Sequence, residues 1–211
     1  MSLIVALILL IFIFVLRKIK IIGITGSIGS GKSTSAKYLS KIGHVIDFDN
    51  IVKTIYYSGV VNLKILKLFG QSVFNKNIIN RRAISNIVFI TDKPKLTELH
   101  KILKWHIIDN ALISAIIAIL FGQWTIILDC PLLFESHLYK ICHKIVLISS
   151  STNNKIKRII QRDNRPIEII EQIMKLQMSD INRQKLKPNC IIINNDSSLT
   201  NLYKSLDNIS F

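Results

Sequence analysis

A glycine-rich stretch near the start of the chain has the spacing of a phosphate-binding loop. Residues 26–33 read GSIGSGKS and match G-x-x-x-x-G-K-[ST], between an apolar run and a segment with helical spacing. Glycines allow the backbone N–H groups to point at a phosphate, and the positive end of the following helix adds to the attraction. The pattern predicts a nucleotide site made of Gly26, Ser27, Ile28, Gly29, Ser30, Gly31, Lys32, Ser33 and Thr34.

Three residues in and near this loop could act directly on a nucleotide. Lys32 can reach the β- and γ-phosphates of ATP, and the hydroxyl of Ser33 can ligate Mg²⁺. Asp129 ends another apolar run and could hold the metal through a water, although a purely structural strand-end carboxylate is the alternative. A chance glycine-rich turn is also an alternative, but the strand and helix that we expect around the loop argue against it.

The group that receives the phosphate is suggested by two acids in the stretch HVIDFDN. We expect Asp47 and Asp49 to lie at the end of a second strand, where ligands bind in open parallel sheets. Side chains two apart on a strand point the same way, so both carboxylates could face one cleft and take a proton from an acceptor hydroxyl. Solvated acids that cap a following helix are the alternative.

Arginines recur with helical spacing in the second half of the chain. Arg158, Arg162 and Arg165 are spaced i, i+4, i+7 and would share one face of a helix. Such a helix could close over a nucleotide and place cations near the transferred phosphoryl group. A solvated basic face is the alternative.

The order of apolar runs predicts an α/β protein with a parallel sheet. A helix is expected over residues 32–43, mainly helical structure over 51–121, and two basic helical stretches within 153–177 that are separated at Asn164–Pro166. The runs expected to form strands cover residues 20–25, 44–50, 124–131, 143–150 and 190–196.

Composition gives weaker indications of partners and compartment. The 211 residues carry a net charge of +15, which suits anionic partners, but Ile, Lys and Asn are abundant throughout the chain, so compositional drift is the alternative. The chain has three widely spaced cysteines and no CxxC motif, so they indicate neither a disulfide framework nor a zinc site. Scattered thiols of this kind fit a reducing compartment.

The chain begins with an apolar segment followed by basic residues. Residues 3–16 contain no polar side chain, and RKIK follows at 17–20. As a helix they would span about 21 Å, less than the roughly 30 Å hydrocarbon core. We expect a membrane anchor over residues 1–19, with the rest of the chain in the cytosol and the phosphate loop facing away from the bilayer. A buried core helix, a wrongly assigned start and a soluble cytoplasmic protein are the alternatives.

Several segments, in order, resemble one family, the dephospho-CoA kinases. The resemblance extends from about Ile21 to Asp196, and the combination of VIDFD with PLLFE is more specific than the phosphate loop alone. The segments that carry it are GITGSIGSGKST, HVIDFDNIVK, INRRAISNIVF, LDCPLLFES, RIIQRDNRPIEIIEQIMKLQ and CIIINND, with LTELHKIL a looser match.

The resemblance implies a fold, an activity and roles for particular residues. It implies a three-layer P-loop kinase fold over residues 20–211, with a helical CoA-binding region at about 55–121 and a helical lid at about 155–185. ATP with Mg²⁺ would phosphorylate the ribose 3′-hydroxyl of dephospho-CoA. The implied residues are Asp49 as base with Asp47 beside it, Arg81 and His100 in the substrate region, Leu132, Leu133 and Phe134 on the acceptor side, Arg158 and Arg162 in the lid, and Arg183 near the adenine.

The sequence departs from the family pattern at three positions. Lys101 stands where the family has a proline, Asp196 where a glycine is usual, and Ser27 where the family has a second loop glycine. Ser27 is compatible with the loop as long as its φ is negative. Lys101 and Asp196 place the local turn and the adenine-side loop in question.

Other functions remain open at this point. A different nucleoside-monophosphate or small-molecule kinase could use the same loop and acids. A P-loop switch protein is less favoured because NKNI at residues 75–78 lacks the aspartate of the N-K-x-D motif, and a membrane-tethered nucleic-acid binder would rest on charge alone. We expect a monomer that acts on a small molecule and has no nucleic-acid partner.

Overall fold

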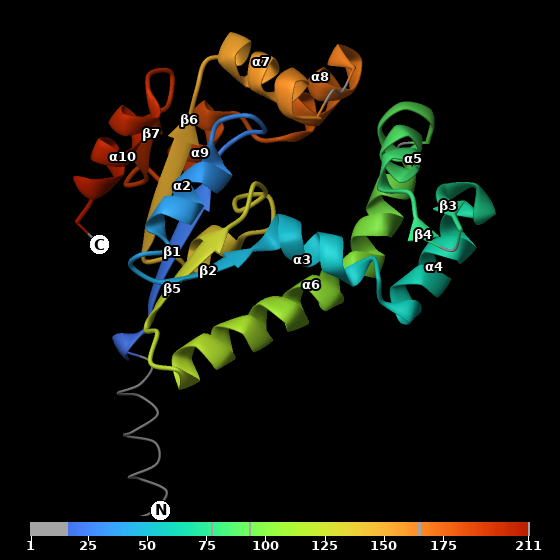
Figure 1. Ribbon diagram of the computed structural model, residues 1–211, viewed down its shortest axis with the longest axis horizontal. Helices are drawn as coiled ribbons and strands as arrows, with labels where there is room; N and C mark the ends of the chain where they lie inside the picture. The colour runs from blue at the N-terminus through green and yellow to red at the C-terminus, as the bar shows by residue number, and fades with distance from the viewer. Residues whose placement is uncertain (1–16, 77, 93, 164–165, 211) are drawn as a thin grey trace, which may run out of the picture.

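The computed structural model describes residues 17–76, 78–92, 94–163 and 166–210, and its centre is a parallel sheet (Figure 1). Five strands lie in the order β2-β5-β1-β6-β7, and every neighbouring pair is parallel. The strands are β1 (Lys20–Thr25), β2 (His44–Asp47), β5 (Thr125–Asp129), β6 (Lys144–Ser149) and β7 (Ile191–Asn194). This arrangement confirms the predicted α/β fold with a central parallel sheet.

Helices cover both faces of the sheet and make it the middle of three layers. One face packs against α2 (Lys32–Leu39) and α10 (Leu199–Asp207), and the other against α3 (Phe48–Ile55) and α6 (Pro94–Leu120). Side chains alternate between the faces along each strand, as the two-residue period of a strand requires. In β5, for example, Ile127 packs on the α2 side, whereas Leu128 belongs to the cluster on the opposite face.

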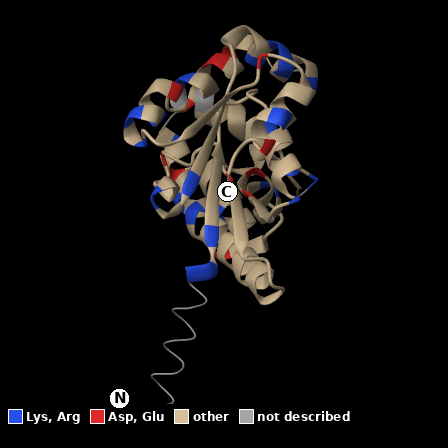
Figure 2. Cartoon of the chain, turned by 90° about the vertical axis from the view of Figure 1, so that its left-hand side faces the viewer, with Lys and Arg blue, Asp and Glu red and all other residues tan. Residues whose placement is uncertain are grey.

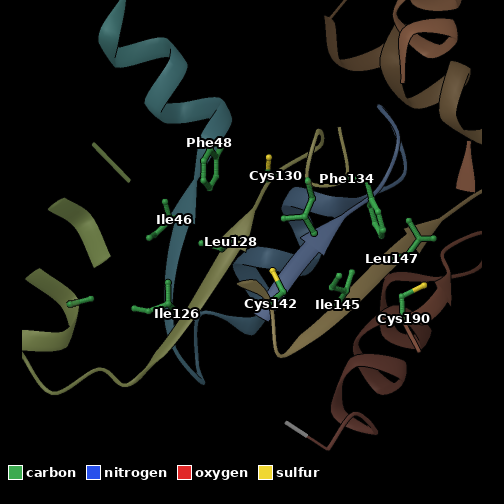
Figure 3. Close-up of a cluster of buried hydrophobic side chains, with 12 residues drawn as sticks. Ile46, Phe48, Ile126, Leu128, Cys130, Phe134, Cys142, Ile145, Leu147 and Cys190 are labelled. Atoms are coloured by element: carbon green, nitrogen blue, oxygen red, sulfur yellow. The ribbon is translucent and has the colours of Figure 1, made fainter. Parts of the chain in front are cut away.

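The cluster on the α6 side joins the strands to the segment after β5. Figure 3 shows Leu128 of β5 and Ile145 and Leu147 of β6 in one buried group with Phe134, which follows β5 in the chain. Phe134 is also stacked on Tyr139, with 5.1 Å between ring centres. This packing fixes the segment that leaves the carboxyl end of β5.

A second, helical region with its own core projects from one side of the sheet (Figure 1). It contains α4 (Gly59–Phe69), η1 (Gln71–Val73), α5 (Arg81–Asn86), η2 (Ile87–Thr91) and the first half of α6. It also contains a short antiparallel hairpin of β3 (Phe74–Asn75) and β4 (Ile78–Ile79), which was not predicted. These elements lie within residues 55–121, for which the sequence predicts a substrate-binding region, and that role stays a prediction.

Three helices lie over the carboxyl end of the sheet, where the lid was expected. They are α7 (Thr152–Asp163), α8 (Ile167–Leu176) and α9 (Asp180–Leu186). The first two appear in orange at the top of Figure 1, and α9 lies below them, beside β6. The helix α7 ends at Asp163, and Pro166 is the N-cap of α8 rather than its first helical residue, while residues 164 and 165 of the predicted break lie outside the described residues. Arg165 lies outside the described residues.

Element ends differ from the predictions in two places. The helix α2 ends at Leu39 rather than at Gly43, and β2 ends at Asp47, so residues 48–50 begin α3 instead of extending the strand. A short 3₁₀ turn, η3 (Leu138–Ile141), precedes β6. The predicted N-terminal helix falls on residues 1–16, which lie outside the described part of the chain.

Candidate active site

Acidic residues and the glycine loop meet at the carboxyl edge of the sheet. The loop follows β1 directly, while β2 ends at Asp47 and β5 ends at Asp129, and these two acids are opposite each other in the parallel register. Because the strands are parallel, the carboxyl ends of β1, β2 and β5 lie on the same edge of the sheet. The sequence prediction that these elements converge is confirmed.

At several glycines of the loop, close contacts with neighbouring residues leave no room for a Cβ atom. Gly29 and Gly31 have φ values of 79° and 99°, in the left-handed region that favours glycine. A Cβ on Gly31 would lie 2.1 Å from Nδ2 of Asn195, which donates a 2.8 Å hydrogen bond to the carbonyl oxygen of Ser30. Ser27 does not have a positive φ, so its replacement of a family glycine is tolerated by the backbone.

Replacing Gly31 by alanine should weaken nucleotide binding by about tenfold or more. The new Cβ would displace Asn195, and the left-handed backbone would add roughly 1–2 kcal/mol of strain. Isothermal titration with a non-hydrolysable ATP analogue measures the change. Gly59→Ala is the matched control, because no atom lies within 4 Å of the added Cβ and the φ is not positive. Unchanged affinity in Gly31→Ala would contradict this account of the loop.

The loop lysine connects two of the acids. The amino group of Lys32 forms a short ion pair with Oδ1 of the buried Asp129 and lies 3.7 Å from Oδ2 of Asp49. Burial raises the pKa of the Asp129 carboxyl, and the neighbouring positive charge of Lys32 opposes that rise. Lys32 therefore stands between the buried carboxylate and one that is open to a ligand.

Asp47 and Asp49 reach the site in a different way from the one predicted. Asp47 is the N-cap of α3, and its Oδ1 accepts a 2.9 Å hydrogen bond from the backbone N–H of Asn50. Asp49 lies in the first turn of α3, so the argument that both side chains share a strand face was wrong. The turn nevertheless brings the Asp49 carboxylate, 54% exposed, to Lys32.

The residues present are suited to a divalent cation that arrives with a nucleotide. Ser33 is exposed in the first turn of α2, and the negative charges of Asp47 and Asp49 both act on Asp129. Among the described residues there is no group of three or more His, Cys, Asp or Glu side chains placed to hold a metal. Magnesium commonly binds through one or two protein ligands plus substrate phosphates, and Ser33 with Asp129 fits that mode.

Arg158 is bonded to the backbone around the loop. Its guanidinium donates to the carbonyl oxygen of Asn195 at 2.8 Å, to that of Gly29 at 3.4 Å and to the hydroxyl of Ser150 at 3.3 Å. In this arrangement Arg158 fastens the base of the lid to the phosphate loop.

Arg162 is one helical turn further along α7. It makes a two-point ion pair with the adjacent Asp163, at 2.7 and 2.8 Å. The Asp163 carboxylate raises the pKa of Arg162, and the charge of Asp49 adds to the effect. Arg162 is thus within electrostatic reach of the candidate base.

Arg183 does not reach the site in the predicted way. Its side chain has no exposed surface, so in this structure it cannot contact an adenine. It donates instead to the carbonyl oxygen of Pro131 and to Oε1 of Glu135, both at 3.2 Å, and to Asp180 at 3.4 Å. The arginine fills the gap between α9 and the segment after β5, which a buried cation can do only with such partners.

Two further residues, whose roles were not predicted from the sequence, also join α9 and its neighbours to the rest of the site. Gln177 accepts a 2.9 Å hydrogen bond from the N–H of Ile28 in the phosphate loop, and Glu135 accepts one of 2.7 Å from the N–H of Met178. Together with Arg183 they link the loop, the lid and the segment after β5. Both residues belong to motifs that carry the family resemblance, and this membership is the sequence signal that could have pointed to them.

The apolar triplet after β5 is only partly available to a ligand. Leu133 and Phe134 are fully buried in the core, and a Cβ on Gly23 would come within 2.6 Å of Leu133. The prediction that they line the acceptor side is therefore wrong for these two residues. Leu132 is partly exposed and remains a candidate.

Arg81 and His100 lie in the helical region rather than at the loop. Arg81 begins α5 and is exposed, and its charge lowers the pKa of Tyr56, which burial raises to about 12. His100 is on α6, where desolvation lowers its pKa. The helix continues through Lys101, so the absence of the family proline leaves no break there.

Asp196, which replaces the usual glycine, anchors the start of the lid. Its Oδ1 accepts hydrogen bonds from the Ser150 hydroxyl at 2.7 Å, the Ser151 N–H at 2.8 Å and the Asn154 side chain at 2.9 Å. These donors hold the pKa of the Asp196 carboxyl well below its usual range.

The stabilising contribution of Asp196 should depend on pH. A carboxyl whose pKa is lowered by folding stabilises the native state above its ordinary pKa and loses that contribution as the pH falls below it. Urea unfolding should show the wild type more stable than Asp196→Asn at neutral pH, with a smaller difference near pH 3. A difference that is constant with pH would contradict this assignment.

Comparisons with known proteins agree with the fold and with the ordered motifs. The family model described as dephospho-CoA kinase matches residues 20–201. A dephospho-CoA kinase of Fusobacterium nucleatum is 38% identical over 191 residues, which cover 90% of this chain and 96% of that protein.

Two solved structures are similar along almost the whole chain. A crystal structure from Thermus thermophilus has a TM-score of 0.74 at 26% identity and covers 90% of this chain and 95% of its own. A dephospho-CoA kinase from Campylobacter jejuni has a TM-score of 0.60 at 26% identity, with 89% and 93% covered. Because the family model matches most of its length and a relative is 38% identical over 90% of it, this chain belongs to the dephospho-CoA kinase family.

Proposed function

We propose that this protein transfers the γ-phosphoryl group of ATP to the ribose 3′-hydroxyl of dephospho-CoA, the last step of coenzyme A synthesis. The proposal is supported by family membership and by one geometric observation. An open carboxylate, Asp49, lies 3.7 Å from the amino group of the phosphate-loop lysine. A base that accepts a hydroxyl proton must stand beside the terminal phosphate, and the distance from Asp49 to Lys32 supports that role for Asp49.

In the proposed reaction the acceptor enters between Asp49 and the loop. The 3′-oxygen forms a bond to the γ-phosphorus while the bond from that phosphorus to the β–γ bridging oxygen breaks, and ADP leaves with the bridging oxygen. The hydroxyl proton passes to Asp49. Lys32, held by Asp129 and Asp49, and Arg162, within reach of Asp49, supply positive charge to the equatorial oxygens.

Ser33 and Asp129 would hold Mg²⁺, which when bound neutralises charge on the β- and γ-phosphates. Backbone N–H groups of the loop other than those of Ile28 and Ser30, which bond to Gln177 and to the carbonyl of Ser27, would bind the phosphates, and the positive end of α2 would favour them. Leu132, Arg81 and His100 are the described candidates for contact with dephospho-CoA. Asp47 supports the site from its capping position on α3.

An acceptor screen on the full chain tests this proposal. ADP release is measured with dephospho-CoA, nucleoside monophosphates and small-molecule alcohols, each with ATP and Mg²⁺. Turnover with dephospho-CoA far above the others is the expected result. Turnover with a different acceptor and none with dephospho-CoA would favour the alternative, a related small-molecule kinase.

We also propose that the apolar residues 3–16 tether a monomeric kinase domain to a membrane with that domain in the cytosol. The apolar run and the basic residues 17–20 after it support this proposal. Fractionation of cells that express the full chain or a version starting at Lys20 tests it. Equal recovery of both in the soluble fraction would contradict it.

A further inference from the structure

The second half of α6 is apolar on two opposite faces. One face, with Ile107, Ala111, Ala115 and Ile119, packs against the core cluster of the sheet, and Ser114 beside them contacts His44 at 2.8 Å. The opposite face is exposed and carries Trp105, Leu112, Ile113, Ile116, Ile117 and Leu120, with Phe121 directly after the helix. We refer to these seven residues as the outer face of α6.

This outer face is unusual for a soluble surface. Trp105 is 66% exposed, Leu120 79% and Phe121 82%. Residues 110–124 include no charged side chain, and the exposed Asp109, one helical turn from Trp105, is the acid that borders the apolar stretch. From Leu112 to Phe121 the exposed side chains of this face are all apolar, and exposed apolar surface of this kind generally marks an interaction site. By length and composition α6 could cross a membrane, but its inner face packs on the protein core and is not free to face lipid. Among the described residues of α6, those of the outer face are the apolar ones left open to another surface.

Basic residues lie near Trp124, close to the end of the outer face of α6. The N–H of Lys20 donates a 2.8 Å hydrogen bond to the carbonyl of Trp124, and the amino group of Lys18 lies 5.8 Å from the centre of the Trp124 ring. Trp124 is three residues after Phe121. Figure 2 shows lysine and arginine gathered where the described chain begins, and Arg17 is exposed there. This end of the molecule therefore presents apolar and positively charged groups side by side.

We propose that the outer face of α6 docks on an anionic lipid bilayer, with the helix lying in the plane of the interface. Apolar side chains would enter the boundary between headgroups and acyl chains, and Arg17, Lys18 and Lys20 would contact lipid phosphates and carboxylates. Two features favour lipid over a second copy of the chain. The adjacent positive charges would repel one another across a symmetric dimer, and the apolar residues 3–16 continue from the same point of the surface.

The docked orientation leaves the active site accessible. Lys20 is at the amino end of β1, whereas the phosphate loop follows the carboxyl end of that strand. The bilayer would therefore lie at the edge of the sheet opposite the glycine loop and the acids. Docking does not depend on the identity of the acceptor, so the kinase assay and the docking test can fail separately.

Tryptophan fluorescence can test this docking, because the chain has two tryptophans and Trp105 lies on the outer face. Full-length protein carrying Trp124→Phe reports on Trp105 alone. It is mixed with vesicles of phosphatidylcholine and about 30 mol% phosphatidylserine, with and without brominated acyl chains. We expect a blue shift and quenching by the brominated lipid, both weaker with phosphatidylcholine alone or at high salt. An unshifted, unquenched Trp105 would overturn the proposal even if residues 3–16 insert.

Two charged variants on this background locate the contact. Ile116→Glu with Leu120→Glu should abolish the quenching of Trp105 by the brominated lipid, whether or not residues 3–16 hold the protein on the vesicle. Val60→Glu with Leu63→Glu, at exposed apolar positions of α4, is the matched control and should leave the quenching unchanged. Equal quenching in the two variants would overturn the proposal. If the α6 variant fails to fold, the quenching of Trp105 in the protein with an unaltered outer face still tests the docking.

Acrylamide quenching without lipid tests whether another segment of the chain or a second copy of the protein covers the outer face of α6. Acrylamide should quench Trp105 freely, because the ring is exposed. Shielding that does not depend on protein concentration would show that another segment of the chain covers the face, and shielding that increases with concentration would show self-association. Either result would overturn lipid docking.

Discussion

Lys32→Met should lower kcat/KM for ATP-dependent phosphoryl transfer by at least about 10²–10³-fold and also destabilise the protein. The activity is lost because the amino group would no longer stabilise charge on the γ-phosphate. Stability is lost because Asp129 is 2% exposed and would remain buried without its partner, which typically costs about 3–5 kcal/mol. Steady-state kinetics and urea unfolding measure the two effects.

The two effects of Lys32→Met can be separated. Without Lys32 the pKa of Asp129 should rise further, so the loss of stability should be largest at neutral pH and smaller at acidic pH, where the carboxyl is protonated. Adding Asp129→Asn should recover stability and no activity. Recovery of activity in the double variant would show that Lys32 only neutralises Asp129.

Asp49→Asn should lower kcat by about 10²–10⁴-fold and leave ATP affinity nearly unchanged. Asparagine keeps the shape of the side chain but cannot take the hydroxyl proton. Because Asp49 is 54% exposed, the substitution should have little effect on folding. Rapid-quench kinetics with saturating ATP and dephospho-CoA separate the chemical step from binding.

Asp109→Asn is the control for Asp49, since Asp109 is an exposed acid on α6. It should retain wild-type kcat and KM. Asp49→Asn activity within about tenfold of the wild type would exclude Asp49 as the general base.

Much of the sheet and of the phosphate loop could be predicted because their signals are local. Each strand is a short apolar run, and the loop spacing has backbone requirements that Gly29 and Gly31 meet through their positive φ values. The small hairpin β3–β4 was missed because strands of two residues have no periodicity to detect. The end of β2 was misplaced because Asp47 changes the chain from strand to helix as an N-cap.

Side-chain roles that depend on burial were predicted less well. Phe134 belongs to a motif that resembles one of a known family, and Arg183 follows another at six residues from its end. Both lie in the interior, because packing between α9, the β5–β6 segment and the sheet decides their environment. The same packing places Gln177 against the phosphate loop, a contact across 149 positions of sequence. Spacing along the chain holds no information about such distant contacts.

Product analysis with the full chain tests the central claim most directly. Dephospho-CoA, ATP and Mg²⁺ are incubated with wild type, Asp49→Asn and Asp109→Asn, and the product is examined by mass spectrometry and ³¹P NMR. We expect one added phosphoryl group on the ribose 3′-oxygen with wild type and Asp109→Asn, and almost none with Asp49→Asn. Phosphorylation at another position, or full product formation by Asp49→Asn, would contradict the account.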